Sequence, residues 1–258
     1  MPSLFSFDRG SGPPLVFLHG FCDTHAFWTE FVQVFFSSYR ILAPDLPGFG
    51  RSAILPSSFT MEDVGNVVAS WIREKALDKP IVIGHSLGGY VALSLMKDHS
   101  ELLSGIGLVH STPYEDSPER KIIRNKVIEF VGRNGVAPFV ETFVPGLFLD
   151  KSHPAIATTR IRALTTSKGA LAGYAKAMAG RQDMSATLLQ RELPAFMIAG
   201  EEDALIPIGS LRKLAGMGKN LSLHELPKVA HMGVFEAKKQ CQEIISKFAA
   251  RVMLNKVI

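Results

Sequence analysis

The sequence has few cysteines, no long apolar run and no secretion signal. Its two cysteines, Cys22 and Cys241, fit neither a disulfide framework nor a metal-binding C-x-x-C spacing, which favours free thiols in a reducing compartment. No apolar stretch is long enough to span a bilayer, and the first residues lack a basic start followed by an apolar run. The sequence therefore predicts a soluble, cytoplasmic protein with no membrane partner.

The chain also has only a small excess of positive over negative charge. The formal net charge is +4 over 258 residues. Residues 112–183 hold eleven Lys/Arg against seven Asp/Glu, so this segment accounts for the whole excess. Because these basic residues form no dense run, nucleic-acid binding is disfavoured. A solvated helical face explains them simply, and an anionic substrate group or an acidic carrier protein is the functional alternative. The basic residues that could hold such a substrate are Arg120, Lys121, Arg124 and Arg133.

The apolar pattern predicts an α/β domain. Hydrophobic residues make up 47% of the chain, enough for the core of one large domain. Short apolar runs alternate with helical periodicity, which is typical of right-handed βαβ units and a mostly parallel sheet. Strands are expected at residues 14–18, 39–43, 81–83, 105–110, 193–200 and 220–226, with a short edge strand near Phe5 and Phe7. Helices are expected at residues 26–36, 60–76, 90–96 and 234–253, with one starting near Pro207.

The alternation stops in the middle of the chain. Residues 112–189 have helical patterns and no convincing strand, and Pro138 and Pro145 are expected to break the helices. The clearest helical patterns there cover residues 120–131, 154–166 and 169–179. In the first of these, the apolar residues are expected to form one face, from Ile122 and Ile123 to Val131. We therefore expect a core domain of residues 1–111 and 190–258, with residues 112–189 as a helical insertion over the sheet.

The most informative stretch is residues 84–89, Gly-His-Ser-Leu-Gly-Gly. A β-branched run ends at Gly84, Ser86 follows, and a helix-like segment opens after Gly88. This is G-x-S-x-G in a strand–turn–helix setting, the nucleophile elbow that exposes a serine hydroxyl at a sharp turn. Glycine suits both flanking positions because a β-carbon would obstruct the close approach of strand and helix. Ser86 is thus the candidate nucleophile, and a plain strand–helix turn that holds a serine is the alternative.

A serine nucleophile needs a base, and the base needs a carboxylate to orient it. Asp203 and His231 each follow a predicted strand, at the edge where open α/β sheets place their sites. Asp203 could also be a turn or helix-cap residue, and Glu201 and Glu202 are rival carboxylates. The loop position favours Asp203 as the acid, and His231 is the candidate base.

The oxyanion of the reaction needs two fixed N–H donors. The amide of Leu87 follows the nucleophile at a helix N-terminus, where the helix dipole helps. The amide of Phe21, in the loop after the strand at residues 14–18, is the second candidate. Further candidates for the pocket wall, each as compatible with packing as with substrate contact, are His19, Gly20, Cys22, His25, His85 and His110.

Five segments together resemble the α/β-hydrolase superfamily and occur in that family's order. They are the His19-Gly20 pair, residues 45–52, residues 84–89, residues 200–207 and the His231 loop. The resemblance implies a mostly parallel sheet with helices on both faces, a helical lid formed by the insertion, and no metal or organic cofactor. A serine nucleophile argues against haloalkane dehalogenases and soluble epoxide hydrolases, which use aspartate. Only one convincing strand precedes Pro14, so the sheet is expected to be shortened at that edge.

The expected function is a serine hydrolase that cleaves a small carboxylic ester or thioester through an acyl-enzyme. Ser86 would attack the acyl carbon, His231 would take its proton and Asp203 would hold the imidazole. Within the same family, the alternatives resemble carbon–carbon bond hydrolases, the cofactor-free lyase of menaquinone synthesis, carrier-protein esterases and perhydrolases. A slow-turnover small-molecule receptor is an alternative of another class, since such receptors keep the triad. The fold alone does not fix the substrate, and the sequence does not fix the oligomeric state.

Overall fold

The computed structural model describes residues 3–56 and 58–254, so residues 1–2, 57 and 255–258 of the expected core domain lie outside the described residues. Seven strands form one sheet in the order β1-β3-β2-β4-β5-β6-β7. β1 pairs antiparallel with β3, and every other neighbouring pair is parallel. The strands are β1 (Ser6–Arg9), β2 (Pro14–Leu18), β3 (Arg40–Pro44), β4 (Ile81–His85), β5 (Gly105–Val109), β6 (Ala195–Gly200) and β7 (Leu221–Leu226). This confirms the predicted α/β sheet, with β1 as the single described strand before β2.

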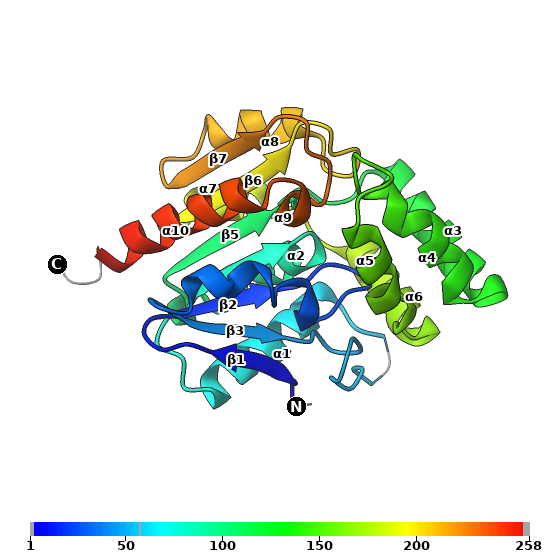
Figure 1. The fold of residues 1–258 in the computed structure, drawn as a ribbon, viewed down its shortest axis with the longest axis horizontal. Helices are drawn as coiled ribbons and strands as arrows, with labels where there is room; N and C mark the ends of the chain where they lie inside the picture. The colour runs from blue at the N-terminus through cyan, green and yellow to red at the C-terminus, as the bar shows by residue number, and fades with distance from the viewer. Residues whose placement is uncertain (1–2, 57, 255–258) are drawn as a thin grey trace.

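Helices cover both faces of the sheet, and α10 crosses in front of it in Figure 1. One face packs against α1 (Met61–Glu74), α2 (Leu87–Asp98), α7 (Ser185–Gln190) and α8 (Ile208–Ala215). The other packs against the 3-10 helices η1 (His25–Phe27) and η2 (Phe31–Phe35), with α9 (Gly233–Glu236) and α10 (Lys238–Leu254). Alternate residues of each central strand enter the two cores. Burial on both faces explains why these strands read as continuous apolar runs.

The start of α1 follows from local sequence. The Asp63 amide donates to the Thr60 hydroxyl (3.1 Å), and the Thr60 amide donates to the Asp63 carboxylate (2.8 Å). This reciprocal pair is a capping box, with aspartate in place of the usual glutamate. The apolar face of the helix, which includes Val64, Val68 and Ile72, is buried in the core.

Three local predictions were wrong. Residues 26–36 form η1 and η2 instead of one helix, because a segment rich in aromatic residues has a weak helix propensity and its rings are fixed by burial. The single helix expected at residues 234–253 is split into α9 and α10 at Ala237, whose φ is −135°. Pro138 and Pro145 do not break α4 (Val136–Gly146). Pro138 lies in the first turn, where no N–H is needed, and Pro145 is next to the last residue.

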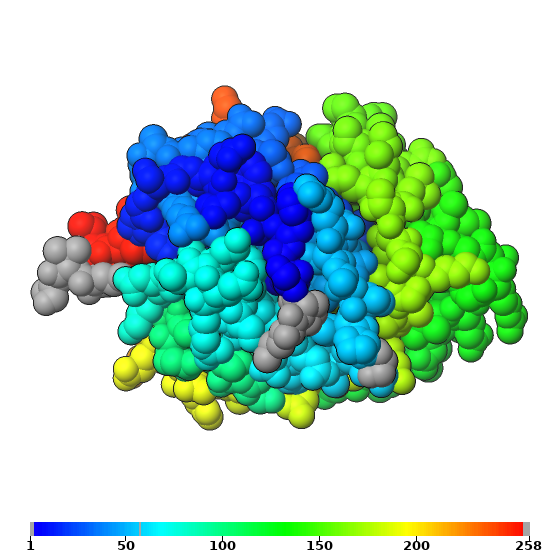
Figure 2. Space-filling model, turned by 90° about the horizontal axis from the view of Figure 1, so that it is seen from below, coloured from blue at the N-terminus to red at the C-terminus, as the bar shows by residue number. Residues whose placement is uncertain are grey.

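Between β5 and β6 the described chain forms helices joined by loops, with no strand. Figure 1 places α3 (Pro118–Asn134), α4, α5 (Ala155–Leu164) and α6 (Lys168–Gly180) beside the ends of the parallel strands, and Figure 2 shows them as a lobe at one end of the molecule. We call α3 to α6 the helical insertion. It is tied to the core where the buried Tyr174 hydroxyl donates to the Pro47 carbonyl (2.9 Å).

The expected apolar face of α3 is not buried as a whole. Val131 is buried, whereas Ile122 and Ile123 are 54% and 58% exposed. Among residues 3–56 and 58–254, none of the helices has the length and apolar composition needed to cross a bilayer.

Candidate active site

Ser86 lies at the turn between β4 and α2, in a backbone conformation that few non-glycine residues adopt. Its φ is 50° and its ψ is −112°, which stores local strain that the surrounding packing must hold in place. A β-carbon at Gly84 would lie 2.1 Å from the carbonyl carbon of Gly88, and one at Gly88 would lie 2.3 Å from the carbonyl oxygen of Leu18. The two glycines therefore allow β4, α2 and β2 to meet, and this contact forces the sharp turn at Ser86.

His231 and Asp203 are joined by a short hydrogen bond. The Nδ1–H of His231 donates to Asp203 Oδ2 at 2.8 Å. The other carboxylate oxygen accepts from the amides of Leu205 (2.9 Å) and Ile206 (3.0 Å). Both carboxylate oxygens are thus fixed, and with them the orientation of the imidazole ring.

A second histidine contacts the same carboxylate. His110, at the end of β5 and fully buried, donates from Nδ1 to Asp203 Oδ2 at 3.3 Å. A β-carbon at Gly233 would lie 2.3 Å from His110 Nε2, so His110 packs directly against the segment that follows His231. Sequence reasoning named His110 as a possible pocket residue, and the structure places it behind Asp203, away from the pocket wall.

The electrostatics of this group keep Asp203 charged. Burial alone would raise the pKa of Asp203, but the charge of His231 and the hydrogen bonds from His110 and His231 lower it below its ordinary value. Burial lowers the pKa of His110, and it lowers that of His85 further, with help from His231 and His110. Asp203 is therefore an anion, and the lowered pKa values of His110 and His85 favour their neutral forms. His110, Asp203 and His231 are also close enough to share a metal ion, although hydrogen bonds already use the oxygen between them.

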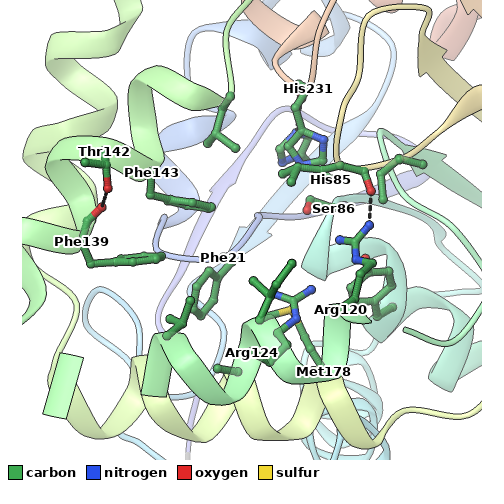
Figure 3. Close-up of a pocket in the computed structure, with 17 residues that line it drawn as sticks. Phe21, His85, Ser86, Arg120, Arg124, Phe139, Thr142, Phe143, Met178 and His231 are labelled. Carbon is green, nitrogen blue, oxygen red and sulfur yellow. Dashed lines mark hydrogen bonds between the residues drawn. The ribbon is translucent and has the colours of Figure 1, made fainter. Parts of the chain in front are cut away.

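Ser86 and His231 line one cavity of about 320 Å³. Figure 3 shows both side chains at the core end of this cavity. Most of the remaining wall is apolar, and α3, α4 and α6 of the insertion supply much of it. Four aromatic side chains contribute to it, namely Phe21, Tyr90, Phe139 and Phe143.

Of the two candidate oxyanion donors, Leu87 directly follows Ser86, and Phe21 lines the same cavity as Ser86. Within the described residues, the amides of Phe21 and Leu87 have no hydrogen-bond acceptor in the protein. His85 braces this region, since its Nε2 donates to the His231 carbonyl (3.0 Å). Its Nδ1 would lie 2.7 Å from a β-carbon at Gly20. The loop that carries Phe21 and the loop that carries His231 are thereby packed on the two sides of one imidazole ring.

Of the six further pocket candidates, only His85 lines this cavity. His19 is buried and its Nε2 accepts from the Leu46 amide (2.9 Å). His25 donates from Nδ1 to the buried Asp45 at 2.8 Å. Cys22 is buried, and burial raises the pKa of its thiol, so it lacks the character of a second nucleophile. The aromatic residues Phe139 and Phe143 of the insertion were not predicted to line the cavity, because its helices had no predicted contacts with the core.

Comparison with known proteins gives the family. A family model described as the alpha/beta hydrolase fold matches residues 13–238. The chain belongs to the alpha/beta hydrolase fold family. A solved thermophilic esterase from Thermogutta terrifontis has a TM-score of 0.90 at 28% identity, over 96% of this chain and 93% of that one. The chain is an α/β-hydrolase enzyme that resembles carboxylesterases.

Two curated relatives of this α/β hydrolase differ in length. The dihydrolipoyllysine-residue acetyltransferase component of the acetoin cleaving system of Pseudomonas putida is 26% identical over 95% of this chain, which spans 65% of that protein's length. The pimeloyl-[acyl-carrier protein] methyl ester esterase of Aeromonas hydrophila is 27% identical over 93% of this chain and 96% of its own length. The second relative therefore matches this α/β hydrolase over most of both chains.

Three buried histidines predict a loss of stability in mild acid. Burial lowers the pKa of His19, His85 and His110 in the folded protein, whereas the unfolded chain protonates each near pH 6.5. Below that pH the unfolded state binds more protons. The free energy of unfolding should therefore fall by up to about 1.4 kcal/mol per pH unit for each histidine, until the folded pKa is reached.

Urea unfolding at pH 7.5, 6.5 and 5.5 measures this loss. In His19→Asn, which lacks one of the three proton-binding groups, the decline should be shallower by about one proton. An unfolding free energy that is the same at pH 7.5 and pH 5.5 would contradict the prediction.

Proposed function

We propose that this α/β hydrolase is a serine hydrolase that cleaves small carboxylic esters or thioesters through an acyl-enzyme. The main support for the proposal is that a candidate nucleophile and a candidate base line the same cavity. Ser86 stands there on its strained turn, and His231 faces the same space with Nδ1 bonded to an ionised, doubly anchored Asp203. A nucleophile, a base and an orienting carboxylate are the parts that acyl transfer needs.

The reaction would proceed in two similar halves. Ser86 Oγ attacks the acyl carbon while His231 Nε2 takes its proton, and Asp203 stabilises the imidazolium that forms. The oxyanion accepts hydrogen bonds from the amides of Phe21 and Leu87. As the tetrahedral intermediate collapses, His231 returns the proton to the leaving alcohol or thiol. Water, deprotonated by His231, then attacks the acyl-enzyme. His231 returns that proton to Ser86 Oγ as the bond to the acyl carbon breaks and the acid is released.

The helical insertion would act as a lid over Ser86. Support comes from the cavity itself, because α3, α4 and α6 supply much of its wall. An apolar wall of this kind excludes water and strengthens the electrostatic interactions at the reacting centre. In this proposal the core domain is residues 1–111 and 190–258, and the lid is residues 112–189.

Two relatives agree with an ester substrate. The esterase from Thermogutta terrifontis shares 28% of its residues with this chain, and the relative from Aeromonas hydrophila acts, by its name, on the methyl ester of a pimeloyl group held on acyl-carrier protein. The cavity of about 320 Å³ favours a small acyl group. We therefore propose a small-molecule ester or thioester as the partner of the site.

Hydrolysis of p-nitrophenyl esters from acetate to decanoate tests the proposal. Rapid turnover is expected, with the highest kcat/KM at short chains and a decline once the chain exceeds the cavity. Labelling by a fluorophosphonate, followed by peptide mass spectrometry, should place the adduct on Ser86. If folded protein neither turns over any ester nor takes up the label, the serine hydrolase proposal is wrong. The carbon–carbon hydrolase, lyase and receptor alternatives would then be tested in turn.

A further inference from the structure

We propose that the substrate of this site carries a carboxylate on its acyl chain, and that Arg124 of the helical insertion binds it. This inference rests on the proposed function and names the substrate class of the same cavity. Figure 3 shows the side chains of Arg120 and Arg124 in the wall of the cavity that Ser86 lines. Both arginines come from α3, four residues apart, so they lie on the same face of that helix.

Three arginines surround one buried acid beside this cavity. The side chain of Asp116 is fully buried and forms ion pairs with Arg120 (3.4 Å), Arg124 (3.0 Å) and Arg181 (2.8 Å). Burial opposes its ionisation, but the charges of Arg124 and Arg181 lower the pKa of Asp116 below its ordinary value. The group therefore holds three positive charges and one negative charge, an excess of two.

The excess positive charge of this group lies beside the apolar cavity that Ser86 lines. Among the described residues that line the cavity there is no aspartate or glutamate. The side chains of Arg120 and Arg124 are 30% and 18% exposed, so water screens them only in part. Partly buried charge without a counter-ion is costly, and an anion in the cavity would offset that cost.

The hydrogen bonds single out Arg124 as the free member of the group. Arg181 donates to the carbonyl oxygens of Met178 (2.8 Å) and Tyr114 (2.8 Å) and lies 4.0 Å from the ring centre of Tyr90. Arg120 donates from Nη1 to the carbonyl oxygen of Leu205. These two guanidinium groups therefore already donate hydrogen bonds to carbonyl oxygens of the protein.

Arg124 keeps one edge of its guanidinium group unused. Its Nε donates to Asp116 Oδ2 at 3.0 Å. In the part of the chain that the structure describes, neither of its Nη groups has an acceptor in the protein. Two parallel N–H groups match the two oxygens of a carboxylate. Because a single edge is available, a planar monoanion fits it better than a group of higher charge.

The other basic residues of α3 do not line the cavity; they are Lys121, Lys126 and Arg133. Lys121 pairs with Glu115 at 2.6 Å, and Arg133 is exposed and absent from the cavity wall. Sequence reasoning placed both beside Arg120 and Arg124 as candidates for an acidic substrate. Arg133 now provides a control on the same helix.

Two esters of matched length test the inference. We expect wild-type protein to have a higher kcat/KM for mono-p-nitrophenyl glutarate, whose acyl chain ends in a carboxylate, than for p-nitrophenyl valerate, whose chain ends in a methyl group. In Arg124→Gln the ratio of the two kcat/KM values should fall about tenfold to a hundredfold, the effect of losing a charge-assisted hydrogen bond. Arg124→Lys should recover part of the ratio, since it restores the charge without the fork. Arg133→Gln should leave the ratio unchanged.

The neutral ester separates this inference from the proposed function. Turnover of the valerate ester without preference for the glutarate ester, or a ratio that is the same in Arg124→Gln, would overturn the inference and leave the serine hydrolase standing. Binding of monomethyl glutarate, measured by calorimetry in wild-type protein and in Arg124→Gln, decides the inference even if neither ester is turned over. Weaker binding in the variant supports it, and equal binding overturns it.

Discussion

Ser86→Ala is expected to lower kcat for p-nitrophenyl butyrate by about a millionfold, the loss typical of a serine hydrolase without its nucleophile. Alanine fits the same turn with a smaller side chain, so the contacts between Gly84, Gly88 and Leu18 stay in place. The variant should therefore unfold at a temperature close to that of the wild type. Steady-state kinetics and thermal unfolding followed by circular dichroism measure the two expectations.

Ser104→Ala provides the matched control. Ser104 precedes β5, at the amino end of that strand and thus at the edge of the sheet away from Ser86. Its hydroxyl is buried and has no hydrogen-bond partner in the described residues, so its removal should change neither kcat nor the unfolding temperature appreciably. Without its nucleophile, the enzyme should keep far less than about a hundredth of the wild-type kcat. If Ser86→Ala keeps more than about a hundredth, the nucleophile lies elsewhere.

Asp203→Asn should lower kcat by about 10³- to 10⁴-fold with little change in structure. The carboxylate accepts the Nδ1–H of His231 and stabilises the imidazolium of the transition state. An asparagine can offer its NH₂ group to Nδ1, which would move the proton of the ring to Nε2, where the base must be free. The amides of Leu205 and Ile206 can still bind the side-chain oxygen, so the loop should keep its shape.

Glu201 and Glu202 test whether the loss of kcat depends on the position of Asp203 or only on its negative charge. Glu202 is exposed and adjacent in sequence, and Glu201 is exposed and lies 3.5 Å from Arg212. Glu202→Gln and Glu201→Gln each remove the same charge as Asp203→Asn, and each should change kcat less than about threefold, since exposed charges act weakly over distance. A comparable loss in either variant would argue against Asp203 as the orienting acid.

The parts of the site that could be predicted are those set by local chemistry. The close contact of Gly84 with Gly88 can be predicted from the five consecutive residues that contain both glycines. Asp203 and His231 were found because each follows a strand, and parallel strands bring their carboxyl ends to one edge. The fold was predictable for a related reason, because strands buried on both faces leave continuous apolar runs in the sequence.

The parts that were missed depend on contacts between distant segments. Asp116 and Arg181 are far apart along the chain, and no periodicity predicts that they form an ion pair. The contact of His110 with Asp203 likewise joins residues 93 positions apart. The face of α3 was misjudged because its apolar residues serve different purposes. Ile123 lines the cavity while Val131 packs in the core, so a single buried face was the wrong expectation.

The burial of both native thiols makes this enzyme suited to site-specific labelling. Cys22 and Cys241 are 1% and 0% exposed, and burial raises the pKa of Cys241 to about 12. Maleimide dyes react with exposed thiolates, so neither cysteine needs to be replaced first. A cysteine introduced at Ile161 on α5 and another at Met217 after α8 would stand at positions that are 66% and 71% exposed. A fluorophore pair at these positions would report, in solution and during turnover, the distance between the helical insertion and the core.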